Sequence, residues 1–353
     1  MRKIDDYLKT ALKQNASDLH FVSGDPVRVR VHGELGILME EKLTTEVVQE
    51  AIMEIMDGTT QLAFERDEAA DFAYEIPDVS RFRVNAFRHL NGIGAIFRAI
   101  PSKPLTLEQL NMPPVIHDMC KQTSGMILVT GKTGSGKSTT LAAMIDAINK
   151  RMKGHILTIE DPIEFVHKTQ NSLISQREIG LHSGSFAEAL RSALREDPDV
   201  ILVGEMRDLE TISIAVTAAE MGILVMGTLH TNGAAQTVDR IINSFPADKQ
   251  SHIRTMISTS LRGVVSQQLL PTKGKAGRIA ALEVLINTSA VANLIRQGKL
   301  DQLETAMQSG GNVGMKTMDA ALMELVEKAF VSGRDAYKQA ENKSKFERLR
   351  NED

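Results

Sequence analysis

The run Gly131-Lys132-Thr133-Gly134-Ser135-Gly136-Lys137-Ser138 decides the fold of this chain. It follows an apolar segment, 126–129, and precedes residues 141–148, where apolar side chains recur at helical spacing. A strand, a glycine-rich loop and a helix in this order are the context in which the pattern G-x-x-x-x-G-K-S/T binds phosphate. The sequence therefore predicts a site for a nucleoside triphosphate.

Each residue type in this loop has a chemical reason. The glycines let backbone N–H groups curl around a β-phosphate, and the amino end of the following helix adds a favourable dipole. Lys137 can reach the β- and γ-phosphates, and the hydroxyl of Ser138 can ligate Mg²⁺. The predicted nucleotide contacts are Thr133, Gly134, Ser135, Gly136, Lys137, Ser138 and Thr139.

Composition narrows the class of protein. The 353 residues leave room for two or three domains, and a net charge of −4 weighs against a protein that holds nucleic acid by its phosphates. The single cysteine, Cys120, excludes an intrachain disulfide and a cysteine-rich zinc site. No apolar run approaches the roughly 18 residues of a membrane-spanning helix. We therefore expect a cytosolic, zinc-free protein.

The first hundred residues predict a small α+β domain, 1–100. Alternating apolar residues over 27–31 indicate a half-buried strand, and 44–65 indicate helices with one interruption. Alternating runs on either side of Asn91-Gly92 indicate a hairpin. A cluster of prolines then predicts a linker over 101–118.

Residues 119–353 predict a doubly wound α/β domain, in which buried parallel strands alternate with helices. The expected strands are 126–130, 155–159, 199–203 and 223–229, and the expected helices are 137–150, 185–196 and 208–221. Beyond 246 we expect mainly helix, with an apolar stripe over 253–265 and a late strand at 278–286. The polar end, 338–353, is expected to fray.

Three further motifs follow predicted strands, at the sheet edge where ligands of open α/β sheets bind. Residues 160–164, Glu-Asp-Pro-Ile-Glu, bring three carboxylates together, which favours a bound cation or water. Glu205 follows the apolar run 200–203, where an acid holds Mg²⁺ or polarises the attacking water. His230 follows the fourth strand, where it can sense a γ-phosphate.

Arginines gather in the predicted N-terminal hairpin, at 81, 83, 88 and 98. They form either a solvated basic face or arginine fingers, which stabilise charge on a departing γ-phosphate. Because the linker separates this hairpin from the phosphate loop, fingers there would act across a domain or subunit boundary.

Together these motifs resemble those of the secretion ATPase superfamily and, within it, the type IV pilus retraction ATPases. The resemblance covers nearly the whole chain. Near the start, segments 16–21 and 27–35 carry it. In the second domain, 158–164 is similar to the family's aspartate box, 190–208 to its Walker B region and 228–232 to its histidine box.

The resemblance implies a homohexameric ATPase that binds ATP and Mg²⁺, built from a PAS-like N-terminal domain and a RecA-like domain over 119–353. It implies pilus retraction as the work done, an inner-membrane platform protein as partner, and a place at the cytoplasmic face of that membrane. The implied residue roles are Ser138 and Glu205 at Mg²⁺, Glu164 as general base, His230 as γ-phosphate sensor, and Arg83 and Arg98 as arginines that reach the nucleotide. The residues alone do not decide between Glu164 and Glu205 as the base.

Two features bear on the kind of motor. Assembly-type relatives carry a tetracysteine zinc motif that one cysteine excludes here, which favours retraction. Residues 290–297 resemble a retraction motif, Ala-Ile-Arg-Asn-Leu-Ile-Arg-Glu, with Val291, Ala292 and Gln297 in place of its first Ile, first Arg and Glu.

The alternatives to a main retraction motor are an accessory retraction ATPase, another secretion ATPase, a nucleic-acid translocase or a non-hydrolysing scaffold. The acids and Lys137 of the nucleotide motifs argue against a non-hydrolysing scaffold.

Overall fold

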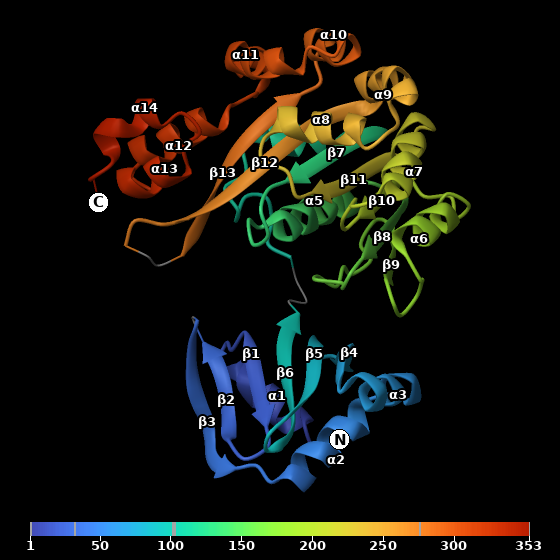
Figure 1. The fold of residues 1–353 in the computed structure, drawn as a ribbon, viewed down its shortest axis with the longest axis vertical. Coiled ribbons are helices and arrows are strands. Elements are labelled where there is room, and N and C mark those ends of the chain that lie inside the picture. The colour runs from blue at the N-terminus through green and yellow to red at the C-terminus, as the bar shows by residue number, and fades with distance from the viewer. Residues whose placement is uncertain (1, 32, 101–103, 275–276, 353) are drawn as a thin grey trace. The chain divides into compact units, whose positions relative to one another are not determined.

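The computed structural model describes residues 2–31, 33–100, 104–274 and 277–352. The chain divides into two compact units, each with its own sheet and core (Figure 1). One unit is Met1–Lys103 with Glu164–Val166, and the other is Pro104–Ile163 with His167–Asp353. Among the described helices, none has the length and apolar character needed to cross a membrane.

The first unit is an antiparallel sheet whose core is closed by three helices. Its elements are α1 (Asp5–Lys13), β1 (Asp18–Val22), β2 (Pro26–Val31), β3 (Glu34–Lys42), α2 (Thr45–Ile55), α3 (Gly58–Asp67), β4 (Ala69–Ile76), β5 (Ser80–His89) and β6 (Gly92–Ile100). The strands lie in the order β3-β2-β1-β6-β5-β4.

Alternation along the strands decides which face of this sheet is covered. Val84 and Phe97 lie opposite each other on β5 and β6, and both are buried with apolar side chains of the helices. Arg83 and Arg98, the adjacent pair, point to the other face because successive side chains of a strand alternate. The hairpin predicted around Asn91-Gly92 is confirmed by the pairing of β5 with β6.

The second unit is built on a sheet with the strand order β13-β12-β7-β11-β10-β8-β9, in which all strands but β13 run parallel to their neighbours. The strands are β7 (Gly125–Thr130), β8 (His155–Glu160), β9 (Leu173–Glu178), β10 (Val200–Val203), β11 (Leu224–Leu229), β12 (Leu261–Pro271) and β13 (Arg278–Ile286). The helices are α4 (Pro114–Met119), α5 (Lys137–Arg151), α6 (Phe186–Ala193), α7 (Leu209–Glu220), α8 (Ala234–Asn243), α9 (Ala247–Ser260), α10 (Ser289–Gln297), α11 (Leu303–Ser309), α12 (Met318–Glu327), α13 (Gly333–Gln339) and α14 (Lys343–Phe346), with short 3-10 turns at Leu300–Gln302, Gly311–Val313 and Glu347–Leu349. The predicted doubly wound α/β fold is confirmed.

The central strands of this sheet are buried on both faces, as parallel strands covered by helices should be. In β7, Met126 and Leu128 pack into one core cluster, and Ile127 and Val129 pack into another. The first cluster contains residues of α6 to α9, and the second contains residues of α4 and α5. This two-sided burial explains the continuous apolar runs in the sequence.

The structure corrects the prediction beyond residue 246. The apolar stripe over 253–265 is not one helix, because α9 ends at Ser260 and β12 begins at Leu261. Pairing of β12 with β7 makes the difference, since a short apolar run fits a buried strand as well as a helix. β9 is a further strand that the sequence analysis does not predict; its residues are mostly half-buried and form no continuous apolar run.

The C-terminal end is also more ordered than predicted. Residues 338–353 were expected to fray, but they contain the end of α13, α14 and a 3-10 turn. Phe346 is fully buried there, in a small core formed with residues such as Leu270 and Leu322. One apolar anchor therefore holds a segment whose composition is mainly polar.

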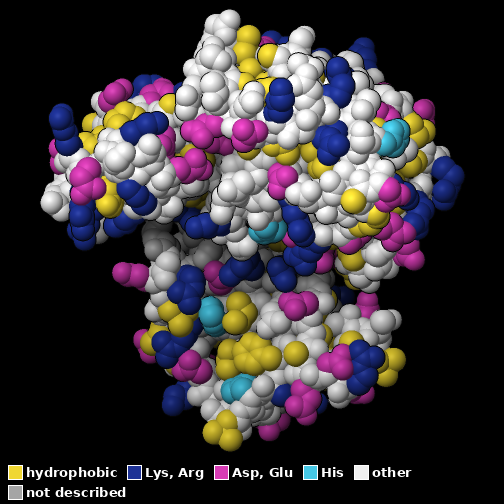
Figure 2. All heavy atoms as spheres, turned by 45° about the horizontal axis from the view of Figure 1, so that its top comes forward, with side chains coloured by type: hydrophobic (Ala, Val, Ile, Leu, Met, Phe, Trp, Pro, Cys, Tyr) yellow, Lys and Arg dark blue, Asp and Glu magenta, His cyan; other side chains and the backbone are white. Residues whose placement is uncertain are grey.

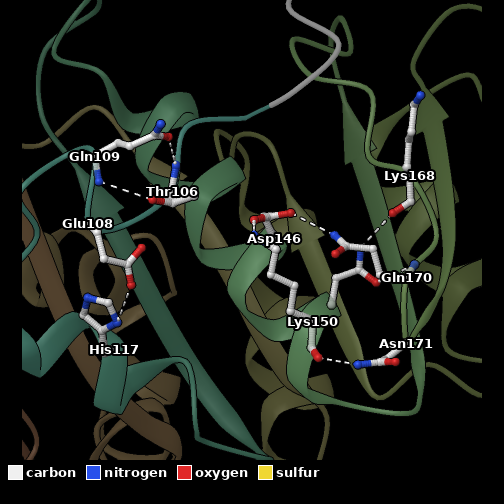
Figure 3. Close-up of polar contacts among 10 residues, drawn as sticks. Thr106, Glu108, Gln109, His117, Asp146, Lys150, Lys168, Gln170 and Asn171 are labelled. Carbon is white, nitrogen blue, oxygen red and sulfur yellow. Dashed lines mark hydrogen bonds and ion pairs between the residues drawn. The ribbon is translucent and has the colours of Figure 1, made fainter.

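The chain between the two sheets has structure of its own from residue 104 onward. The backbone N–H of Thr106 donates to Oε1 of Gln109 at 2.9 Å, and the N–H of Gln109 donates to Oγ1 of Thr106 at 3.2 Å (Figure 3). Leu107 is buried against the second unit's core. The segment predicted as a linker, 101–118, thus has residues that pack on this core, such as Leu107 and Ile116, while 101–103 lie outside the described residues.

Candidate nucleotide site

Three loops meet at the carboxyl ends of neighbouring strands. β11 lies between β7 and β10 in the sheet, so the loops that follow these strands emerge side by side. The loop after β7 is the phosphate loop, residues 131–138, and the loops after β10 and β11 carry Glu205 and His230. The sheet therefore brings together motifs that are far apart in the sequence.

The phosphate loop has positive φ angles at all three of its glycines, Gly131, Gly134 and Gly136. Gly131 and Gly136 have φ angles of +138° and +89°. A Cβ at Gly131 would lie 2.3 Å from the carbonyl oxygen of Gln267. The side chain of Lys137 folds back over the loop, where its Nζ donates to the carbonyl of Gly131 at 2.9 Å and to that of Lys132 at 3.2 Å. The ammonium thus lies over the loop that is expected to enclose the phosphates.

Gln267 on β12 is a buried site residue that the sequence analysis does not identify. Its amide nitrogen donates to the carbonyl of Ser135 at 2.6 Å, and its amide oxygen accepts from Oγ1 of Thr140 at 2.8 Å. One side chain thereby fastens the loop to the first turn of α5. The sequence signal is a polar residue in a buried strand, and it becomes visible only when 261–271 is known to be a strand.

The loop has the polar groups that a triphosphate needs. The hydroxyl of Ser135 is buried and has no hydrogen-bond partner among the residues described by the structure. A buried hydroxyl in that state indicates a missing partner, because buried polar groups are normally hydrogen-bonded. A Cβ at Gly134 would meet open space. Together with Lys137 and the N-terminus of α5, these features fit a bound phosphate chain.

A polar chain runs from the phosphate loop to the end of β10. Oγ1 of Thr133 lies 3.5 Å from Nδ1 of His230, and Nε2 of His230 lies 3.0 Å from Oε1 of Glu205. Nε of Arg207 lies 2.6 Å from the same carboxylate oxygen. Three residues predicted from the sequence are therefore brought together, and Arg207 from the segment similar to the Walker B region joins them.

The neighbours of Glu205 stabilise its charge. Burial raises the pKa of this carboxyl, but the hydrogen bond and charge of Arg207, together with the contact to His230, outweigh that effect and hold the pKa below its usual value. An ionised carboxylate is the form that ligates Mg²⁺ or orients a metal-bound water. Glu205 is therefore in the protonation state that its predicted role requires.

The acidic motif after β8 is divided between the two units. Glu160 accepts hydrogen bonds from Oγ1 of Thr158 at 2.7 Å and from Nε2 of Gln176 at 3.2 Å. Glu164 is exposed and groups with the first unit, together with Phe165 and Val166. The geometry of the second unit alone thus does not place Glu164 at the phosphate loop, and its role as general base stays a prediction.

The chain that follows this motif is fixed to α5, the helix that begins at the phosphate loop (Figure 3). Nε2 of Gln170 donates to Asp146 at 2.9 Å, and the side-chain amide of Asn171 donates to the backbone carbonyl of Lys150. Nδ2 of Asn149 donates to the carbonyl of Lys168 at 2.8 Å. The loop after the acidic motif and the phosphate loop are therefore attached to opposite ends of one helix.

Arg83 and Arg98 are cross-strand partners in the first unit. Like charges directly opposite each other repel, and each arginine has an acid beside it. Nε of Arg98 lies 2.8 Å from Asp18, and Nε of Arg83 lies 3.9 Å from Asp71. Burial raises the pKa of Asp18, but hydrogen bonds from Ser17 and Arg98 and the charge of Arg98 bring it below its usual value. The structure thus places the two arginines side by side; their action on the nucleotide stays a prediction.

The described part of the chain contains no group of three or more His, Cys, Asp or Glu side chains that could hold a metal ion. A magnesium ion bound with a nucleotide does not require such a group, because phosphates and water supply most of its ligands and the protein adds only one or two. Ser138 and Glu205 therefore stay the two protein ligands predicted for such an ion.

Known proteins resemble this chain over nearly its whole length. The family model described as "Type II/IV secretion system protein" matches residues 1–332. The type IV pilus retraction ATPase PilT of Pseudomonas aeruginosa is 50% identical over 343 residues, which cover 97% of this chain and 99% of that protein. A twitching motility protein of Neisseria gonorrhoeae is 51% identical over 314 residues, covering 89% of this chain and 84% of that protein.

A solved structure supports the same relationship. The crystal structure of the pilus retraction motor PilT with bound ADP matches with a TM-score of 0.91 and 41% identity, and the match covers 99% of this chain and 100% of that one. The fold is thus a RecA-like ATPase domain preceded by a PAS-like α+β domain, and the chain is a nucleotide-binding ATPase. The chain belongs to the type II/IV secretion system protein family and, within it, to the type IV pilus retraction ATPases.

Proposed function

We propose that this chain works as a homohexameric ring that hydrolyses ATP with Mg²⁺ and drives pilus retraction from the cytoplasmic face of the inner membrane. The observation that carries the proposal is the contact of Thr133, His230 and Glu205 across adjoining strand ends beside Lys137. Its partner there is an inner-membrane platform protein, and its output is depolymerisation of the pilus and twitching motility.

The second unit binds the triphosphate. Residues 133–139 enclose the phosphates with backbone N–H groups and hydroxyls, and Lys137 neutralises the β- and γ-phosphates. Ser138 and Glu205 would hold Mg²⁺, which when bound would help to neutralise the charge of the phosphates. His230 senses whether the γ-phosphate is present, because it lies between the loop and Glu205.

Two further groups act on the reaction itself. Glu164 takes the proton of the attacking water, and Glu205 is the alternative for that task. Arg83 and Arg98 neutralise the charge that develops as the γ-phosphate leaves. Since both arginines belong to the N-terminal α+β unit, this step makes hydrolysis depend on that unit and links chemistry to movement.

The variant Glu205→Gln is expected to bind ATP but to turn it over roughly 10²-fold more slowly, because the amide keeps the shape and loses the charge that serves metal and water. Steady-state ATPase assays and fluorescent-nucleotide titrations measure the two effects. Glu210→Gln is the matched control, since Glu210 of α7 is exposed and forms an ion pair with Arg191 of α6. Wild-type turnover of Glu205→Gln contradicts the assignment.

α10 offers a test of the segment that resembles the retraction motif. Ile295 is fully buried in the core and Leu294 packs against it, whereas Asn293 and Arg296 are exposed. The helix therefore has one face that stabilises the domain and one face that can contact a partner. Substitutions on the two faces should have different consequences.

Ile295→Ala is expected to lower the free energy of unfolding by about 2–5 kcal/mol, because it leaves a cavity in the core. The double variant Asn293→Ala/Arg296→Ala should change it by less than about 0.5 kcal/mol and keep ATPase activity, yet retract pili poorly. Thermal unfolding, ATPase assays and a retraction assay in a deletion strain measure these outcomes. Normal retraction by the double variant contradicts a coupling role for this face.

Surface charge does not favour a nucleic-acid motor. Basic and acidic side chains are intermixed over the visible face of the second unit (Figure 2), and the net charge of the whole chain is −4. A protein that follows nucleic acid presents a contiguous basic surface.

The proposed function is tested on the purified protein and in cells. Electron microscopy should show six-fold rings, ATP hydrolysis should stop when EDTA removes Mg²⁺, and a deletion strain should extend pili without retracting them. Hydrolysis that persists in EDTA contradicts the metal role, and normal retraction in the deletion strain contradicts the motor role.

A further inference from the structure

One buried carboxylate contacts the first residues of two helices. Glu283 on β13 is 3% exposed. Its Oε1 accepts from the backbone N–H of Ala234 at 2.6 Å, and its Oε2 accepts from the backbone N–H of Met318 at 3.2 Å. Ala234 begins α8 and Met318 begins α12. The two oxygens of one side chain thus join two helices that are widely separated in the sequence.

The contact at Ala234 is one of three that fix the start of α8 to the sheet. Thr130, Ser266 and Glu283 lie side by side on β7, β12 and β13, and all three are buried. Oγ of Ser266 accepts from the backbone N–H of Gly233 at 2.9 Å. Oγ1 of Thr237 on α8 lies 3.4 Å from Oγ1 of Thr130, the last residue before the phosphate loop. A row of polar side chains across three strands therefore receives the first turn of the helix.

This turn follows directly after the histidine loop, residues 230–233. Oγ1 of Thr231 lies 2.7 Å from Oγ1 of Thr237, so the loop is also joined to α8 by side chains. His230 itself reaches Thr133 on one side and Glu205 on the other. The position of His230 relative to the phosphates consequently depends on how the start of α8 is held.

The contact at Met318 leads to the C-terminal helices. α12 packs on β13 and, with α13 and α14, forms a separate small core around Leu322 and Phe346. Asp319, the next residue, is also a buried carboxylate that accepts two backbone N–H groups, those of Glu341 and Asn342 at 2.9 and 3.2 Å. Both of these amides belong to the C-terminal helical part. The hydrogen bonds of Asp319 therefore stay within that part, whereas Glu283 joins it to the first residue of α8.

We propose that Glu283 is a positioning residue that ties the histidine loop to α12, so that the nucleotide state at His230 and the packing of the C-terminal helices change together. The proposal rests on the sensor role assigned to His230 in the proposed function. It adds an output for that sensor within the second unit, separate from the arginines of the first unit. When one helix end moves, its backbone amide loses a strong hydrogen bond to the carboxylate of Glu283. Because the same carboxylate also accepts from the other helix, a displacement of one helix changes the hydrogen bonding of the other.

The burial and the two hydrogen bonds of Glu283 determine how strongly it connects the two helices. Burial raises the pKa of Glu283, and the nearby Glu304 and Asp319 raise it further, although the two backbone hydrogen bonds favour the charged form. Such a buried carboxylate depends on both of its donors, because burial separates it from the bulk solvent that could replace a lost one. Movement of α8 therefore leaves Glu283 with an unmet hydrogen bond that only rearrangement at α12 can relieve.

The variant Glu283→Gln tests the link with almost no change in shape. A glutamine amide accepts with its oxygen but donates with its nitrogen, so one of the two backbone N–H groups faces a donor. Asp319→Asn is the matched control, since it makes the same change in a neighbouring carboxylate that does not touch α8. Hydrogen exchange of the full-length protein is measured over residues 234–243 and 318–327, without nucleotide and with a non-hydrolysable ATP analogue. ATPase activity is measured alongside.

In the wild type, the analogue is expected to change exchange in α8 and in α12 together. Glu283→Gln should keep the change in α8, lose it in α12, and lower kcat roughly ten-fold. Asp319→Asn should keep both changes and the wild-type kcat. In a His230→Ala background, Glu283→Gln should produce no further loss of kcat, because a positioning residue acts through the residue that it positions.

Three results overturn the proposal. They are a wild-type α12 that does not respond to the analogue, a response of α12 that survives Glu283→Gln, and additive losses of kcat in the double variant. The wild-type measurement needs no substitution, so it can overturn the proposal even where Glu283→Gln unfolds. Failure of the proposed function is distinct, since it appears as a wild-type protein that hydrolyses no ATP.

Discussion

Replacing Lys137 with Ala is expected to abolish measurable ATP hydrolysis and to weaken nucleotide binding. The ammonium now lies 2.9 Å from the carbonyl of Gly131 and 3.2 Å from that of Lys132, on top of the phosphate loop. It is the one cationic side chain predicted to contact both the β- and γ-phosphates, and it stabilises charge in the bound and in the reacting state. Its loss therefore affects both affinity and rate.

The size of this effect separates a catalytic lysine from a structural one. We expect kcat/KM to fall by roughly 10³-fold or more, as for removal of a preorganised charge at a transferring phosphoryl group. Lys132→Ala is the matched control, because Lys132 is an exposed neighbour in the same loop. Its kcat should stay within about two-fold of the wild-type value.

Isothermal titration with ATP and a coupled ATPase assay measure the two variants. Circular dichroism and thermal unfolding show whether Lys137→Ala keeps its fold, since the lysine also caps two loop carbonyls. A folded Lys137→Ala protein that turns over ATP at the wild-type rate contradicts the assignment of this loop as the catalytic phosphate site.

Arg98→Ala and Arg83→Ala are the second pair of variants from which we expect a large loss. Each should assemble and bind ATP, but kcat should fall by about 10³- to 10⁵-fold, the range known for arginine fingers in other phosphoryl-transfer systems. The two side chains lie opposite each other on β6 and β5 and are exposed. Arg83 makes only a 3.9 Å ion pair with the exposed Asp71, so Arg83→Ala should keep its stability, whereas Arg98→Ala also leaves the buried Asp18 without its ion-pair partner. A loss of rate without a loss of stability is therefore the signature of a direct role at the phosphates.

The same sheet provides the control for these variants. Arg30 lies on β2, opposite Asp18, and its Nη1 donates to the carbonyl of Gly33 at 2.7 Å. Arg30→Ala removes a similar charge from the same face and should leave kcat unchanged. Wild-type hydrolysis by both Arg83→Ala and Arg98→Ala would show that this basic face is only a solvated surface.

A mixing experiment shows whether the arginines act on the nucleotide of their own chain or on that of another chain. Subunits with Arg98→Ala are combined with subunits carrying Lys137→Ala, neither of which hydrolyses ATP alone. Recovered activity means that the arginines and the phosphate loop of an active site belong to different chains. Activity that stays absent in mixed rings means that both belong to one chain.

The sequence by itself determined the nucleotide chemistry, because that chemistry is local. A glycine-rich loop between a buried strand and a helix has few other uses, and its residues are contiguous from 131 to 138. The strand ends that carry Glu205 and His230 could also be predicted, since two-sided burial leaves a continuous apolar run in the sequence. The N-terminal hairpin could be predicted from alternation around Asn91-Gly92.

The tertiary structure decided what depends on contacts between distant segments. The apolar stripe over 253–265 continues past the end of α9 into β12, whose first residues form a strand because they pair with β7. Gln267, as a residue of that strand, then reaches the phosphate loop. Glu283 carries no motif, and only the meeting of α8 and α12 over β13 gives its two oxygens their partners. Propensity and spacing act over a few residues, whereas the free energy of burial and hydrogen bonding depends on which surfaces the whole chain brings together.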